Sequence, residues 1–411
     1  MWNIVKRIRK YYNQNLDLVG IIDGKRAFVG PELVQIDLTN SCNNDCIACW
    51  CRSPLLGNRA ISDEIEKQTL PLDLVKKVLD DCAAIGTTNI YLAGGGEPFM
   101  HPGIMDIIKH IKARGMECHV NTNFTLVDDK KAEQLVVMEV DHLIVSLWSA
   151  TGETYAKTHP NKSKATFDQL IDTVKKVTCI RKGHKPEIIL YNVIMNLNYG
   201  EIEAMVHLAQ ELGVDAVEFA AVDVIPGQTD GLLLNKQQLS EVVQACQRIL
   251  ARMESNGLIN NLEVRIEDFY KLVSNTGATS GDYDDEMLKD IPCLIGWNFS
   301  RILADGNVNA CLKSHRLPVG NIYNASFPEI WNSPEQIHFR KKTLQGNQAD
   351  PFFSMIGNDE SAKWGCSRGC DDIERNKRLW RRMQQQTIFH KMVFKSIGWH
   401  LRRSSLLLKR I

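Results

Sequence analysis

The chain has 411 residues, of which 44% are hydrophobic and 24% charged, an ordinary globular composition that excludes a disordered or collagen-like chain. Its length allows one large domain or two ordinary ones, and no apolar run approaches the roughly 20 residues of a membrane-spanning helix. The formal charge is zero, but four basic residues precede residue 11 and eleven follow Glu374 with no acid among them. The middle of the chain therefore carries a net charge of −15, and this asymmetry indicates an interaction surface at the two ends.

Strand-like and helix-like patterns alternate from residue 33 to about residue 256. The predicted strands are 33–38, 89–93, 117–121, 142–147, 187–195 and 216–221. The predicted helices between them are 71–85, 104–111, 130–138, 167–180 and 202–212. Successive units of this kind must be parallel with right-handed crossovers, so the fold class is α/β with a helix-covered parallel sheet. Six units fit an open, partial (β/α)6 TIM-like barrel or a doubly wound sheet, and in both the ligands collect at the carboxyl ends of the strands.

These patterns divide the chain into five segments. They are a basic amphipathic segment at 1–30, an α/β core at 31–226, a helical linker region at 227–289, a small α+β region of short strands and turns at 290–372, and a basic amphipathic tail at 373–411.

Twelve cysteines are many for this length. No apolar core of a secretory signal follows the basic N-terminus, so we expect a cytoplasmic, reducing setting in which cysteines bind metals or catalyse more often than they form disulfides. Eight cysteines lie in two groups, one between residues 42 and 51 and one between residues 293 and 370. We expect the other four to be buried and inert: Cys82, Cys118, Cys179 and Cys246.

The first group lies directly after the first predicted strand. Cys42, Cys46 and Cys49 are separated by three and two residues, and three thiolates on one tight loop can hold three corners of a cubane iron–sulfur cluster while the fourth iron stays open. A zinc site with Cys51 as fourth ligand is the alternative, although structural zinc prefers two separated pairs of ligands. After the second predicted strand comes Gly94-Gly95-Gly96-Glu97-Pro98. Its glycines allow a cofactor to approach the backbone, and its carboxylate can accept a hydrogen bond from an ammonium group.

These two motifs, one β-α unit apart, resemble the signatures of the radical S-adenosylmethionine (SAM) enzymes, and the resemblance extends over roughly residues 30–225. It implies that Cys42, Cys46 and Cys49 bind a 4Fe–4S cluster whose open iron is chelated by SAM. It also implies SAM contacts, with the strand end at 193–195 along the adenine, from the following residues: Ala48, Gly95, Gly96, Glu97, Pro98, Asn123 and Ser146. The family usually has an aromatic residue where this chain has Ala48, so Trp50 either takes over stacking on the adenine or belongs to the core.

The second group surrounds a predicted hairpin. Cys293 and Cys311 flank two strand-like runs joined by the turn signal Asp305-Gly306, which would bring the two cysteines together. Together with Cys366 and Cys370, this stretch resembles the SPASM and twitch extensions. The resemblance implies one auxiliary 4Fe–4S cluster, held by all four cysteines, that accepts or relays an electron. A structural zinc knuckle is the alternative.

Each basic end contains apolar residues at helical spacing. They are Met1, Ile4, Val5, Ile8 and Tyr12 near the N-terminus, and Phe389, Val393, Ile397 and Leu401 near the C-terminus. Basic amphipathic helices bind anionic membranes or nucleic acid, and the long apolar faces favour a peripheral position at the inner face of a membrane. Helices packed on their own domain, or a disordered tail, are the alternative.

Together these features predict an enzyme that cleaves SAM to a 5′-deoxyadenosyl radical and abstracts hydrogen from an unidentified small-molecule or peptide substrate, with oxidation through the auxiliary cluster. By the same resemblance, a low-potential donor of the flavodoxin or ferredoxin type supplies the electron. A redox-neutral epimerase or rearrangement enzyme, and a non-catalytic iron–sulfur or zinc sensor, are the alternatives. Four polar residues near the fifth and sixth strands either line the substrate pocket or belong to the scaffold: Tyr191, Asn192, Glu218 and Asp223.

Overall fold

The computed structural model describes residues 12, 14–283, 291–346, 350–357, 370 and 372–403. Cys366 and the N-terminal residues from Met1 to Ile8, on which two of the predictions rest, lie outside these residues. Within the described part, one sheet of eleven strands has the order β11-β10-β9-β1-β2-β3-β4-β5-β6-β8-β7.

Six parallel strands form the centre of this sheet. They are β1 (Leu33–Asp37), β2 (Asn89–Ala93), β3 (Glu117–Thr122), β4 (His142–Ser146), β5 (Glu187–Ile194) and β6 (Ala216–Ala221). Each strand pairs with the next one along the chain, whereas a doubly wound sheet reverses its order midway. The fold is therefore the predicted partial barrel, and each predicted strand agrees with the structure to within one residue.

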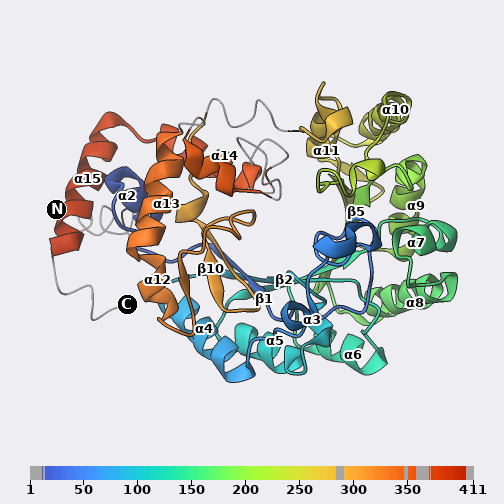
Figure 1. Ribbon diagram of the computed structural model, residues 1–411, viewed down its shortest axis with the longest axis horizontal. Coiled ribbons are helices and arrows are strands. Elements are labelled where there is room, and N and C mark those ends of the chain that lie inside the picture. Colours follow the sequence, from blue (N-terminus) through green and yellow to red (C-terminus); the bar gives the residue numbers. More distant parts are fainter. Residues whose placement is uncertain are drawn as a thin grey trace.

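Helices cover the outer face of this barrel and form the rim visible in Figure 1. They are α4 (Leu72–Ala84), α5 (Ile104–Ala113), α6 (Asp129–Val137), α7 (Gly152–Thr158), α8 (Lys164–Ile180) and α9 (Ile202–Leu212). On α5, the isoleucines at 104, 107, 108 and 111 are all at most 3% exposed, because their spacing places them on the one face that contacts the sheet. The short α7 was not predicted, since two turns are too few to show a helical period.

The segment predicted as a helical linker adds a further unit to the barrel. It holds α10 (Lys236–Arg252), β7 (Leu258–Ile259), β8 (Leu262–Arg265) and α11 (Glu267–Val273), and β8 pairs in parallel with β6. The turn between β7 and β8 is Asn260-Asn261, both with positive φ (50° and 68°), as a tight hairpin requires. Four-residue β8 is too short for its alternation to stand out in the sequence.

The late cysteines flank the predicted hairpin, formed by β9 (Phe299–Ile302) and β10 (Asn307–Asn309), with β11 (Gly320–Asn321) beside it. Gly306 in its turn has φ 84°, which confirms the turn signal. β9 also pairs in parallel with β1, so this region continues the barrel sheet instead of forming a sheet of its own. Three helices complete it: α12 (Phe327–Trp331), α13 (Pro334–Gln345) and α14 (Ile373–Gln384).

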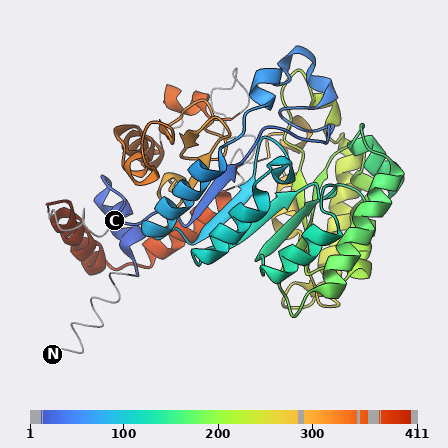
Figure 2. The same ribbon diagram turned by 90° about the horizontal axis from the view of Figure 1, so that it is seen from below.

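Helices near the two ends of the described chain pack against each other. Helix α15 (Ile388–Arg403) lies on α2 (Leu16–Asp23), at the opposite end of the molecule from α8 to α10 (Figures 1 and 2). Phe394 is fully buried there, and its ring meets that of Tyr12 edge-on at 5.4 Å. Of the predicted apolar residues on this helix, Phe389 is 69% exposed, whereas Ile397 and Leu401 pack against the core. A strict i, i+4 repeat turns about 40° per step around a helix, so the first and last of these residues point in different directions.

Candidate active site

All the predicted site residues of the barrel lie at the carboxyl ends of its strands. The loop with Cys42, Cys46 and Cys49 follows β1, the glycine motif follows β2, and Asn123 follows β3. Ser146 is the last residue of β4. The structure therefore brings these predicted site residues together at one edge of the sheet, although they are spread over more than 100 residues of the sequence.

The cysteine loop holds its thiols half-buried. Burial raises the pKa of the Cys42 thiol to about 11 and that of Cys46 well above its usual value, and the charge of a neighbouring cysteine adds to each. Hydrogen bonds from Cys51 lower the pKa of Cys49 to about 6, against its burial, and one of these is the Cys51 backbone N–H, 3.4 Å from the Cys49 Sγ. Of the three thiols, only Cys49 is therefore shifted toward the thiolate that binds metal, and no disulfide joins any of the cysteines in the described residues.

The glycine motif packs directly against Asn40 and Ser41, the two residues that precede the cysteine loop. A Cβ on Gly96 would lie 2.1 Å from the carbonyl oxygen of Ser41, and one on Gly95 would lie 2.1 Å from Asn40 Oδ1. The Glu97 backbone N–H donates to the same Ser41 oxygen at 2.9 Å. We expected these glycines to admit a cofactor, but on the side where a Cβ would project they instead make room for the residues that precede Cys42.

Glu97 is 3% exposed and is held by the adjacent strand. Its carboxylate accepts hydrogen bonds from Thr122 Oγ1 (2.6 Å) and from the backbone N–H groups of Asn123 (2.7 Å) and Phe99 (3.1 Å). Burial raises the pKa of Glu97 to about 7, and these hydrogen bonds act in the opposite direction. The Asn123 amide donates to Asn43 Oδ1 at 2.8 Å, so β3 also supports the cysteine loop.

An apolar wall faces the loop from the ends of β4, β5 and β6. Its buried members are Trp148, Met195, Val222, Val224 and Leu232, and Cys46, Ile47, Ala48 and Val193 pack against them. Sequence reasoning missed Trp148, which is 9% exposed and whose indole N–H has no partner within the described residues. The sequence did offer one indication, because Trp148 lies two residues after Ser146 and therefore just beyond the carboxyl end of a predicted strand. Trp50 is bound to the backbone between two members of this wall, since its indole N–H donates to the Asp223 carbonyl oxygen at 3.0 Å.

Hydrogen bonds tie the segment of Cys293 to α13 and α14. Cys293 donates its backbone N–H to Thr343, and Cys311 lies two residues beyond β10. Asn376 on α14 bonds the backbone on both sides of Cys293, accepting from Leu294 N–H at 2.5 Å and donating to the Pro292 carbonyl oxygen at 3.0 Å. Because Cys370 lies just before α14, these bonds bring its segment to Cys293.

The remaining candidates divide between core and surface. Cys82, Cys118 and Cys246 are buried as predicted, but Cys179 is exposed, because it lies on the outward face of α8. Tyr191 packs inside the barrel and Glu218 faces Arg265. Asn192 is 1% exposed, and Asp223 forms an ion pair with Lys313. Of these, Asp223 adjoins the cysteine-bearing segments.

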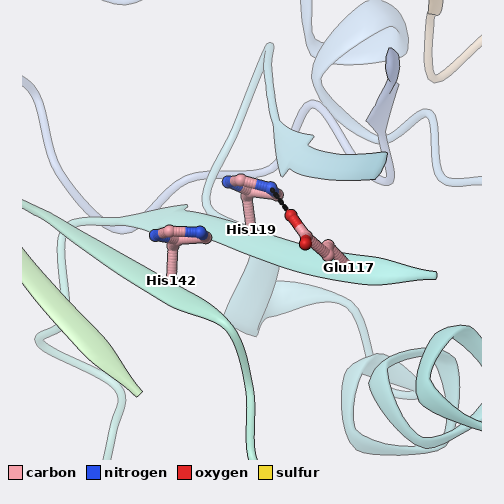
Figure 3. A group of neighbouring side chains, drawn as sticks. All are labelled: Glu117, His119 and His142. Carbon is pink, nitrogen blue, oxygen red and sulfur yellow. Dashed lines mark ion pairs between the residues drawn. The ribbon is translucent and has the colours of Figure 1, made fainter. Parts of the chain in front are cut away.

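A separate polar cluster lies at the opposite, amino-terminal ends of β3 and β4 (Figure 3). His119 and His142 stack with ring centroids 4.2 Å apart and planes 13° apart, and Glu117 lies 3.8 Å from His119 Nε2. Lone pairs on stacked imidazoles lie in parallel planes and do not converge on one ion. His142 Nδ1 already contacts Glu187 at 2.9 Å. These side chains therefore pair with one another and with Glu187 at the amino-terminal ends of β3, β4 and β5.

Comparison with known proteins identifies the family. Residues 36–209 match the Radical SAM superfamily, and residues 293–351 match SPASM, an iron–sulfur cluster-binding domain. The chain is a radical SAM enzyme with a SPASM domain. Membership implies a 4Fe–4S cluster, SAM and auxiliary iron–sulfur clusters, as the sequence predicted. The zinc and sensor alternatives are set aside.

Similar proteins cover most of this radical SAM enzyme. The "Tungsten-containing aldehyde ferredoxin oxidoreductase cofactor-modifying protein" of Pyrococcus furiosus is 25% identical over 75% of this chain and 82% of its own. The "AdoMet-dependent heme synthase" of Methanosarcina barkeri is 27% identical (76% and 84%), and the "PqqA peptide cyclase" of Gluconobacter oxydans is 24% identical (85% and 84%).

Solved structures show the same fold. Streptococcus suis SuiB bound to S-adenosylmethionine aligns with a TM-score of 0.58 and 14% identity over 76% of this chain and 68% of its own. The structure of anSMEcpe with bound AdoMet aligns with a TM-score of 0.59 and 14% identity over 87% and 100%.

Proposed function

We propose that Cys42, Cys46 and Cys49 hold the 4Fe–4S cluster that binds SAM, and that the enzyme oxidises its substrate through an auxiliary cluster on the late cysteines. The observation that carries this proposal is the joining of the two motifs. The cysteine loop and the glycine motif share the Ser41 carbonyl oxygen and the close approach at Gly96, so one rigid unit presents three thiols beside Glu97. Three ligands on one loop suit a cluster with one open iron.

SAM would lie between this unit and the apolar wall. Its amino-acid part would meet the Gly95–Gly96 backbone, Glu97 and Pro98, where Glu97 Oε2 accepts one protein hydrogen bond and keeps a lone pair. Its ribose would lie toward Asn123 and Ser146, and its adenine toward Ala48 and the apolar wall. Trp148 in that wall offers the aromatic surface that Ala48 does not provide.

When bound, the reduced cluster and SAM supply a 5′-deoxyadenosyl radical that abstracts hydrogen from the substrate, with the electron coming from a flavodoxin- or ferredoxin-type donor. The protein itself would orient SAM and protect the radical. Glu97, fixed from three sides by Thr122, Asn123 and Phe99, would hold the SAM ammonium group in one place. The apolar wall would exclude the water and reductants that could quench a radical.

Cys293, Cys311, Cys366 and Cys370 would fully ligate one auxiliary 4Fe–4S cluster, which then offers no open iron to the substrate. Its role would be to accept the electron that oxidation of the substrate radical releases. Relatives are named as a peptide cyclase and a heme synthase, and SuiB was solved with its precursor peptide SuiA. We therefore keep a peptide or a small molecule as the substrate class.

The test is anaerobic reconstitution followed by an assay for 5′-deoxyadenosine and iron. We expect about eight irons per chain, four in each cluster. Replacing Cys42, Cys46 or Cys49 by Ala should abolish SAM cleavage, whereas Cys51→Ala should retain it. Replacing the four late cysteines together should leave about four irons and uncoupled SAM cleavage without product. Equal inactivity of Cys51→Ala and Cys46→Ala would contradict the ligand assignment.

We further propose that α15 attaches the enzyme to anionic membrane surfaces. No described helix is long and apolar enough to cross a membrane. The outward face of α15 nevertheless exposes Ile388 (80%), Phe389 (69%) and Met392 (67%), with lysines and arginines along the same helix. Each basic residue near an anionic surface contributes on the order of 1 kcal/mol, and the apolar side chains add to this.

Co-sedimentation with vesicles tests this attachment. The variant Phe389→Ser/Met392→Ser should bind anionic vesicles less than the parent enzyme, and binding should weaken as salt rises. Val137→Ser removes an equally exposed apolar side chain from α6 and is the matched control. Equal binding to neutral and anionic vesicles, or no loss in the double variant, would refute the proposal.

A further inference from the structure

Two buried cations lie next to Cys311. Arg301 on β9 forms an ion pair with Asp37 at the end of β1, with 2.6 Å between Nη2 and Oδ2, and the two side chains are 14% and 2% exposed. The same guanidinium donates from Nη1 to the carbonyl oxygen of Leu312 at 2.9 Å. Arg301 therefore links the first barrel strand to the residue that directly follows Cys311.

The second cation is Lys313, two residues after Cys311. Its Nζ lies 2.6 Å from Asp223 Oδ2, just beyond β6, and its side chain is 7% exposed. The ammonium group also lies 5.7 Å from the centroid of the Trp50 ring, and Trp50 donates to the Asp223 carbonyl oxygen. Lys313 therefore links the auxiliary site to the residue that follows Cys49.

The two contacts place the segments 49–51 and 311–313 opposite each other. Both cations are fixed by carboxylates that belong to the barrel, so the hairpin β9–β10 cannot move without breaking buried ion pairs. Breaking one would leave an uncompensated buried charge.

A buried charge beside an iron–sulfur cluster changes its reduction potential. Reduction adds one negative charge, so a nearby cation stabilises the reduced state and a nearby anion destabilises it, and both effects are large where water is excluded. Arg301 lies between the segments that carry the two sets of cysteines, whereas Asp37 lies on the barrel side. The pair is therefore oriented with its positive end toward Cys311.

We propose that Arg301 is a positioning residue that raises the reduction potential of the auxiliary cluster held through Cys311, and that Asp37 and the Lys313–Asp223 pair fix it between the two cluster sites. This inference rests on the proposed function only in taking Cys311 as a cluster ligand. It assigns a role to Arg301 and Lys313, which are not among the predicted site residues.

Potentiometric titration of the reconstituted enzyme, followed by electron paramagnetic resonance, tests the proposal. Arg301→Gln should lower the midpoint potential of the auxiliary cluster and Asp37→Asn should raise it. The double variant, which leaves no unpaired buried charge, should fall between them. A purely structural role would shift both single variants in the same direction or in neither. Coincident midpoints in the parent, Arg301→Gln and Asp37→Asn would overturn the proposal.

Two further variants keep the test decisive if the single variants fold poorly. Arg301→Lys keeps the charge, so its midpoint potential should lie closer to that of the parent than the midpoint of the double variant does. A shift in Arg301→Lys as large as that in the double variant would also overturn the proposal. Arg265→Gln removes a cation paired with Glu187 at the far end of the barrel and should leave the midpoint unchanged. If the late-cysteine variant retains all the iron of the parent, the proposed function fails first, and the two failures are distinguishable.

Discussion

The contact between the two motifs leads to a quantitative prediction for Gly96→Ala. The added Cβ would lie 2.1 Å from the Ser41 carbonyl oxygen and 2.6 Å from the Asn40 carbonyl carbon, both backbone atoms that cannot rotate away. An ordinary contact between such atoms is more than an ångström longer, so the stem of the cysteine loop must shift. Gly96 does not have a positive φ, so backbone strain at the glycine does not contribute.

The cost can be worked from two contributions. Overpacking in a well-packed region costs about 1–3 kcal/mol, and losing the hydrogen bond from Glu97 N–H to Ser41 costs about 1 kcal/mol. We therefore expect Gly96→Ala to destabilise the protein by about 2–4 kcal/mol. Since Ser41 directly precedes Cys42, the shift should also lower the iron bound at the early cysteines and leave the iron at the late cysteines in place.

Thermal unfolding and iron analysis of the reconstituted enzyme measure both effects. Gly200→Ala is the matched control, because a Cβ there meets nothing within 4 Å and the backbone does not have a positive φ. It should change stability by less than about 1 kcal/mol. If Gly96→Ala matches Gly200→Ala in melting temperature and iron content, the interlocking of the two motifs is wrong.

Three further predictions follow from single side chains. Burial and the neighbouring His142 lower the pKa of His119 to about 4. The native state therefore binds fewer protons than the unfolded state between pH 4 and about 6.5. As a result, the free energy of unfolding falls by up to about 3 kcal/mol as the pH falls through this window. His119→Gln should remove this loss, so its unfolding free energy relative to the parent should rise from pH 7.5 to pH 5. Arg340 is 1% exposed, its guanidinium lies 4.8 Å and 4.2 Å from the ring centroids of Trp297 and Trp331, and it donates to the Gly296 carbonyl oxygen. Because a lysine cannot reproduce this planar stacking, Arg340→Lys should lower the midpoint of urea unfolding. An unchanged midpoint would contradict this role. Phe394→Ala should cost about 3 kcal/mol at the α2–α15 contact, and limited proteolysis should then release the C-terminal helix faster than in the parent.

Local signals in the sequence determined the barrel. Apolar runs of five to eight residues and helical stripes such as that of α5 repeat within a few turns of the chain, so the positions of β1 to β6 could be predicted to within one residue. The Asp305-Gly306 turn was also predictable from the sequence, because it depends on the backbone freedom of a single residue. The early cysteine motif and the glycine motif indicated the family for a similar reason: the residues of each motif lie close together in the chain.

Tertiary structure alone decided what joins these parts. β9 pairs with β1 although the whole barrel separates them in the sequence, and the ion pair of Arg301 with Asp37 joins residues 264 positions apart. No period or spacing in the sequence encodes such a partner. Trp148 became a candidate only when its strand end met those of β5 and β6, and the burial of Phe394 depends on the contact between α15 and α2. The physical reason is the distance along the chain over which each effect acts. Backbone propensity and side-chain period act within a turn or a strand, whereas burial and charge pairing depend on which surfaces the completed chain brings together.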